Sequence, residues 1–170
     1  MPRPEPSEYP EYHDTYIKLV SGGDISSILE EQIKVTLELL KKLNDEQAMF
    51  RYASDKWTLK QVIGHLIDSE RVFAYRAMCF ARNDPTTLPS FDQDFYVENS
   101  NTNARSLPNI LDEFELLRSA NVAMFKSFDD EIMRGTGTAS GFNFSVRAKA
   151  YIMAGHELHH LNIIQEKYLV

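Results

Sequence analysis

Hydrophobic positions recur at a spacing of three and four residues over four long segments of the chain. This spacing places apolar side chains on one helical face, because an α-helix makes one turn every 3.6 residues. It predicts four amphipathic helices, at about 25–43, 58–82, 107–128 and 145–168. No segment shows a convincing strand-like alternation of apolar and polar positions. The pattern therefore predicts an all-α, single-domain four-helix bundle of the up-down-up-down type over residues 25–170.

Local signals support the boundaries of these helices. Thr58 is followed three residues later by Gln61, so the two side chains can form a capping box at the start of the second helix. Ser145 can cap the fourth helix. Pro108 falls in the first turn of the third helix, where proline is tolerated because that turn's N–H groups have no helical partner. The second helix is expected to stop at Asn83-Asp84-Pro85.

Residues 1–24 form a segment of different composition, with four prolines and the tyrosines Tyr9, Tyr12 and Tyr16. Proline fixes φ and lacks an N–H donor, so the first ten residues are expected to be extended. The tyrosines suggest an N-terminal arm that docks on the bundle. His13 lies in this arm outside any periodic pattern and is expected at the surface.

A long loop is expected between the second and third helices, over residues 83–106. Loops of this length are usually functional or disordered. The loop contains three aromatic residues, Phe91, Phe95 and Tyr96. They indicate that it packs against another surface, either as a roof on a pocket or as part of a dimer contact. The turn-rich segment 135–141 resembles a phosphate-binding loop only superficially, since it lacks the lysine and hydroxyl residue that complete one.

Charge and composition narrow the class of protein. The formal net charge of −7 would repel a phosphate backbone, so nucleic acid is not an expected partner. Cys79, the single cysteine, cannot form an internal disulfide, and the chain does not open like a signal peptide. We therefore expect a cytoplasmic protein. No apolar stretch approaches the roughly 20 residues of a membrane-spanning helix, so no membrane partner is expected either.

The densest chemical signal is Gly155-His156-Glu157-Leu158-His159-His160 in the fourth helix. His156 and His160 differ by roughly 40° around the helix axis, so their imidazoles project side by side toward the interior. Buried imidazoles need partners, and a divalent metal satisfies both nitrogens at once. His65, which faces inward on the second helix, is the candidate third ligand. Three histidines leave a position open for water or substrate, as catalytic metal sites do.

Three other interpretations of these histidines stay open. Each inward histidine could be an ordinary hydrogen-bonded core residue, and His159 could replace His160 as the partner of His156. The same letters also spell H-E-x-x-H, the zincin motif, in which the glutamate acts as general base. That motif needs a third ligand downstream, where Glu166 is the sole candidate.

Several segments resemble a known family. The second-helix segment 56–71 and the fourth-helix segments 145–148 and 154–160 resemble the signatures of the DinB-like (YfiT-like) superfamily. Residues 91–94 and the turn at 137–139 also look like its small-protein branch. The likeness spans about 20–170, nearly the whole domain.

This resemblance implies a four-helix bundle, commonly a homodimer, that binds nickel or zinc through one histidine of helix two and an H-x-x-x-H pair of helix four. His65, His156 and His160 fall on those positions. Relatives include thiol-dependent S-transferases and isomerases that use a low-molecular-weight thiol, and others that are described only as metal-dependent hydrolases. The sequence thus predicts a metal-dependent enzyme that activates a thiol or water to attack a small-molecule substrate. The alternative is a non-catalytic metal-binding or stress-response protein.

Further residues are candidates for roles around the metal. Glu157 and Asp68 could act as bases or support the ligands, and Arg76 could meet an anionic thiol cofactor or a substrate carboxylate. The far side of the fourth helix also carries apolar residues, among them Tyr151 and Leu161. We expect a homodimer to bury that side, although the N-terminal arm could cover it instead.

Overall fold

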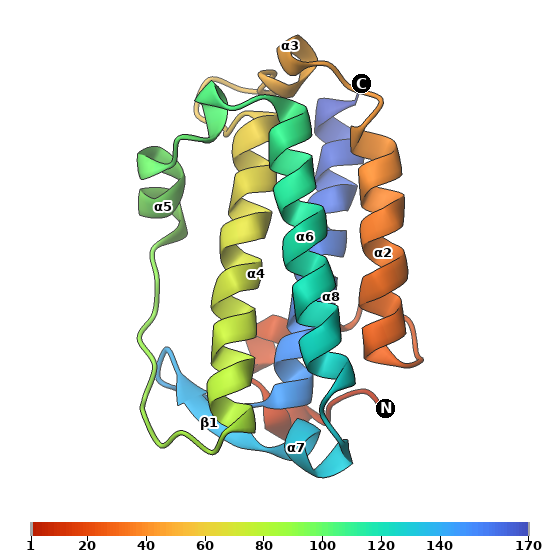
Figure 1. Cartoon of the computed structure of the whole chain (residues 1–170). Helices are drawn as coiled ribbons and strands as arrows, with labels where there is room; N and C mark the ends of the chain where they lie inside the picture. The colour runs from red at the N-terminus through yellow and green to blue at the C-terminus, as the bar shows by residue number, and fades with distance from the viewer. Residues whose placement is uncertain (1, 170) are drawn as a thin grey trace.

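Four long helices form the body of the protein in the computed structural model, which describes residues 2–169 (Figure 1). They are α2 (Ile25–Leu40), α4 (Leu59–Ala81), α6 (Leu107–Lys126) and α8 (Val146–Ile163). The predicted all-α four-helix bundle is therefore confirmed. Thr58 and Gln61 form the expected capping box at the start of α4, and Ser145 accepts a hydrogen bond from the N–H of Ala148 at the start of α8.

Short elements connect these helices. The arm contains the 3-10 turns Pro6–Glu8 and Glu11–His13 and the single turn α1 (Asp14–Ile17). The remaining elements are α3 (Asp45–Ala48), α5 (Gln93–Asn99), a 3-10 turn at Thr102–Ala104, α7 (Asp130–Arg134), β1 (Thr136–Ala139), β2 (Phe142–Ser145) and a closing π-helical turn at Ile164–Tyr168. No helix in the described part of the chain is long and apolar enough to cross a membrane.

The helix order differs from the predicted up-down-up-down arrangement. In Figure 1, α2 and α8 run upward, whereas α4 and α6 both run downward. The side-chain contacts agree. Lys60, near the start of α4, donates to the carbonyl of Arg105, just before the start of α6, and Glu70 in the middle of α4 accepts from Arg118 in the middle of α6. The order is therefore up-down-down-up, and the predicted order was wrong.

The cause of this order is the long connection from α4 to α6. A stretch of about 25 residues can span up to roughly 80 Å when extended. The 23-residue helix α4 is only about 35 Å long. The connection returns along the whole length of α4 and carries α5 beside it (Figure 1). The long loop was predicted, but its consequence for helix direction was not.

A β-hairpin, which the sequence pattern did not predict, closes one end of the bundle. Strands β1 and β2 pair antiparallel, with Thr136 opposite Ser145 and Ala139 opposite Phe142. Ser140 and Gly141 both adopt positive φ. A two-residue hairpin turn needs positive φ at both positions when its twist matches that of the strands. Four-residue strands are too short to show a clear alternation, which explains the wrong expectation of a strand-free chain.

The N-terminal arm docks on the bundle as predicted and joins its core. Ile17 and Val20 are buried in the same apolar cluster as Tyr151 and Ala154 of α8. Gly155 permits this contact, because a Cβ at that position would lie 2.1 Å from the carbonyl oxygen of Tyr16. The arm thus covers much of the second apolar side of α8 within one chain, which removes the reason for placing a dimer contact there.

Candidate metal centre

Two neighbouring antiparallel helices bring the three predicted histidines together. His65 lies in the second turn of α4, and His156 and His160 lie one turn apart on α8. One nitrogen from each ring belongs to a group whose members are all within 4.8 Å of one another. The Nε2 atoms of His65 and His156 are 3.1 Å apart. Helix packing therefore converts a separation of 91 residues into a single compact cluster.

Aromatic rings surround this cluster and shield it from water. The ring of Trp57 lies 5.0 Å from that of His65, and Tyr16 and Phe73 present their rings edge-on to His156 at 5.4 and 5.5 Å. His65 and His156 are buried, and His160 is half-buried. His160 is therefore the least buried of the three histidines.

Burial sets the protonation state of these rings. It lowers the pKa of His65 to about 4 and that of His160 to about 3, where the nearby His65 and His159 add to the effect. Burial, followed by the influence of His160 and His65, also holds the pKa of His156 well below its usual value. All three rings are neutral at pH 7, which is the form of histidine that binds a metal ion.

The donor set fits a divalent cation. Two imidazole nitrogens bound to one tetrahedral zinc at ~2.0–2.1 Å lie about 3.4 Å apart, close to the separation of the His65 and His156 nitrogens. The hydroxyl of Ser69 lies 3.4 Å from Nδ1 of His65, on the side of the ring away from the cluster. Such a contact orients a ligand ring. No fourth histidine, cysteine or carboxylate of the described residues joins the group.

His159 stands outside this group of donors. It is half-buried, and its ring lies 5.4 Å from that of Tyr16 and 5.2 Å from that of His160. The group of donors thus contains His160 and not His159, and the choice of His160 as a ligand stays a prediction.

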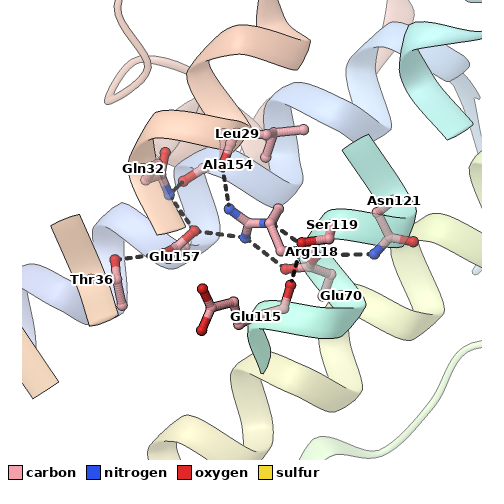
Figure 2. A network of polar contacts seen from close by, with 10 residues as sticks. All are labelled: Leu29, Gln32, Thr36, Glu70, Glu115, Arg118, Ser119, Asn121, Ala154 and Glu157. Atoms are coloured by element: carbon pink, nitrogen blue, oxygen red, sulfur yellow. Dashed lines mark hydrogen bonds and ion pairs between the residues drawn. The ribbon is translucent and has the colours of Figure 1, made fainter. Parts of the chain in front are cut away.

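Glu157 points away from the histidines. Its Oε1 accepts a hydrogen bond from Thr36 at 2.6 Å, and its Oε2 accepts one from Gln32 at 2.6 Å and one from Arg118 at 2.7 Å (Figure 2). Both carboxylate oxygens are therefore occupied by groups of α2 and α6. This placement argues against Glu157 as a base at the metal. It therefore also argues against the interpretation of H-E-x-x-H as a zincin motif, in which the glutamate is that base.

A comparison with known protein families covers the bundle and the histidine cluster. Residues 28–164 match the model of the DinB superfamily, a range that contains all three histidines and the four long helices except the first three residues of α2. The chain belongs to the DinB superfamily.

Relatives of this DinB-superfamily chain carry related descriptions. A candidate metal-dependent hydrolase of Oceanobacillus iheyensis is 25% identical over 128 residues, which cover 73% of this chain and 72% of the relative. Among solved structures, YfiT from Bacillus subtilis is described as a probable metal-dependent hydrolase with an unusual four-helix bundle topology. It matches with a TM-score of 0.73 and 19% identity over 96% of this chain and 89% of its own. A mycothiol-dependent maleylpyruvate isomerase matches with a TM-score of 0.58 and 11% identity, over 89% of this chain and 59% of its own.

The residue that the sequence analysis missed in this DinB-superfamily bundle is Arg118. Only 1% of it is exposed, and it bonds Glu70 through Nε and Nη2 at 2.9 and 2.6 Å and the carbonyl of Leu29 through Nη1 at 3.1 Å (Figure 2). Burial opposes its charge, but Glu157 and Glu70 outweigh that effect and hold the pKa of Arg118 above its usual value. The available signal was its position in the apolar stripe of α6, four residues after Phe114.

The two other predicted polar residues do not contact the histidines. Asp68 lies 3.7 Å from Arg71 in an ion pair, and burial raises the pKa of its carboxyl. Arg76 donates from Nη2 to the carbonyl of Pro89 at 2.6 Å and to the hydroxyl of Ser140 at 3.1 Å. The aromatic residues of the long loop pack on the outer side of α4, where Phe95 is 60% exposed, so they do not roof the histidine cluster.

Proposed function

We propose that this DinB-superfamily protein is a metal-dependent enzyme in which His65, His156 and His160 hold one divalent cation. The observation that carries the proposal is the group of three imidazoles, two buried and one half-buried, with donor atoms within 4.8 Å of one another and no fourth donor among the described residues. A structural metal site is usually closed by four protein ligands, whereas a catalytic site keeps a position open. His65 and His156 are buried and His160 is half-buried. This arrangement favours chemistry over the non-catalytic alternative.

The residues around the histidines prepare the site for this chemistry. When bound, a divalent cation supplies Lewis acidity that lowers the pKa of a coordinating water or thiol to near neutral. Trp57, Tyr16 and Phe73 exclude bulk water from two of the rings, and Ser69 orients His65. Glu157 acts as a positioning residue, because its bonds to α2 and α6 fix the turn of α8 that carries His156.

The descriptions of the relatives support a proposal about the substrate class. One is described as a candidate and one as a probable metal-dependent hydrolase, and a third as a mycothiol-dependent maleylpyruvate isomerase. We propose that the activated nucleophile is water or a low-molecular-weight thiol, that the reaction is a hydrolysis or a thiol-dependent S-transfer, and that the ion is nickel or zinc. Imidazole suits both ions, so the donor set does not choose between them.

Activity assays on two samples, one loaded with zinc and one with nickel, test this function. Protein loaded with zinc or with nickel is given ester and amide substrates in water, and electrophilic S-transfer substrates with a low-molecular-weight thiol. We expect turnover that is lost in His156→Ala and retained in His159→Ala. If metal is bound at one equivalent but neither substrate group reacts with either ion, the non-catalytic interpretation replaces this proposal.

A further inference from the structure

Two buried nitrogens among the described side chains have no hydrogen-bond partner, and both lie outside the histidine cluster. They are Nζ of Lys149 on α8 and Nδ1 of His13 in the arm. Lys149 is 0% exposed and His13 is 7% exposed. His13 was expected at the surface, and that expectation was wrong. A buried polar group without a partner costs free energy, so this pair calls for an explanation.

The two residues meet on one aromatic ring. Nζ of Lys149 lies 3.0 Å from the centroid of Phe144, and the His13 ring meets the Phe144 ring edge-on at 5.2 Å. The face of an aromatic ring attracts a cation but does not replace a hydrogen-bond acceptor. The contact therefore leaves Nζ of Lys149 without a hydrogen-bond acceptor.

A third basic group, Arg76, reaches the hairpin that carries Phe144, since its Nη2 donates to the hydroxyl of Ser140 in the hairpin turn at 3.1 Å. Burial lowers the pKa of Lys149 to about 6 and that of His13 to about 3, and the positive charge of Arg76 contributes to both shifts. Lys149 itself acts on His13 in the same way. Among the described residues, no carboxylate forms an ion pair with any of the three. None of these three basic groups therefore has an ion-pair partner among the described residues.

This basic cluster lies next to the proposed metal centre. Lys149 precedes His156 by seven residues on α8, which is two helical turns or about 10 Å along the axis. Tyr16 joins the two regions from the arm, because its ring lies 6.2 Å from His13 and 5.4 Å from His156. Lys149 and His156 therefore lie on the same face of α8, about two turns apart.

We propose that Lys149, Arg76 and His13 bind an anionic group, a carboxylate or a phosphate, of the molecule that reacts at the histidine centre. The link between the anion and the reacting molecule rests on the proposed function, but the anion site itself does not. A bound anion supplies the acceptors that the Lys149 and His13 nitrogens lack and the charge that balances Arg76. Guanidinium and ammonium groups both recognise carboxylate and phosphate through charge-assisted hydrogen bonds.

Calorimetric titration of the full-length protein with acetate and with inorganic phosphate, at constant ionic strength, tests the site. Each titration is run on protein as purified and after treatment with a chelator, so that anions bound to a metal are not counted. We expect at least one anion to bind the chelator-treated protein, and its affinity to fall at least tenfold in Lys149→Met. Binding of acetate alone identifies a carboxylate site, and binding of phosphate alone identifies a phosphate site.

Two further variants control this experiment. Lys167→Met removes an exposed lysine of the π-helical turn that follows α8 and should leave the affinity unchanged. Lys149→Met replaces a buried amine with an apolar chain of similar length, so it should fold at least as well as the wild type. Arg76→Gln should also weaken anion binding, and it leaves Lys149 in place.

The outcomes separate this inference from the proposed function. If neither anion binds, or if Lys149→Met binds as well as the wild type, the anion site is refuted even when the histidines hold a metal. If an anion binds through Lys149 but the protein takes up no metal, the anion site stands and the proposed metal enzyme does not.

Discussion

His65 and His156 place their Nε2 atoms 3.1 Å apart inside the bundle, in an environment that keeps both rings neutral. An ordinary histidine in the unfolded chain has a pKa of about 6.5. The unfolded state therefore binds more protons than the folded state once the pH falls below that value. This difference links the stability of the metal-free protein to pH.

We predict that the free energy of unfolding of the metal-free protein falls as the pH is lowered from 6.5 to 5. Because the folded pKa of His65 is about 4, this group contributes up to about 1.4 kcal/mol per pH unit over that window. Denaturant unfolding at several pH values measures the slope. His65→Leu should show a shallower slope, and an identical slope in the variant would contradict the account.

The buried ion network of Arg118 predicts a second effect. Arg118→Met leaves Glu70 and Glu157 buried without their cation, so it should destabilise the protein by roughly 3–5 kcal/mol. Arg71→Met, which breaks an exposed pair with Glu113, should cost no more than about 1 kcal/mol. Urea unfolding compares the two variants, and a similar small loss in both would show that the network is not structural.

The docking of the arm depends on Gly155. In Gly155→Ala, the new Cβ would overlap the carbonyl group of Tyr16, which is backbone and cannot rotate away. We expect a loss of about 1–3 kcal/mol and faster proteolysis of the arm. Gly22→Ala is the matched control, because no atom lies within 4 Å of a Cβ there. Equal stability and equal proteolysis of both variants would mean that the arm is not held at this point.

Most of the helical framework and the histidine cluster could be predicted from the sequence. Helix periodicity and the capping box at Thr58 are local signals, and His156 and His160 share a face by spacing alone. His65 could be added only because it lies on an inward face, since no local rule shows that α4 and α8 are neighbours. The family resemblance supplied that link.

The wrong predictions have a common physical cause, because each of these features depends on long-range packing. The direction of α6 depends on how the connection after Arg82 returns along α4, not on any helix pattern. Burial of His13 depends on the arm docking against Phe144, and the placement of Glu157 depends on Arg118 reaching it from α6. Lys149 carried a usable signal, since it lies on the same helical face as His156.

The homodimer implied by the family resemblance is a further prediction. Light scattering after size exclusion should give a mass of twice 19.6 kDa that persists on dilution. A mass of 19.6 kDa at every concentration would refute the dimer and leave the histidine centre unaffected, since all three histidines belong to one chain.

The most direct test of the central claim is the metal content of protein purified without a metal-affinity tag. We predict about one divalent ion per chain, lost in His65→Ala, His156→Ala and His160→Ala and retained in His159→Ala. The absence of bound metal, with no gain in stability on adding zinc or nickel, would contradict the claim and make the three histidines ordinary core residues.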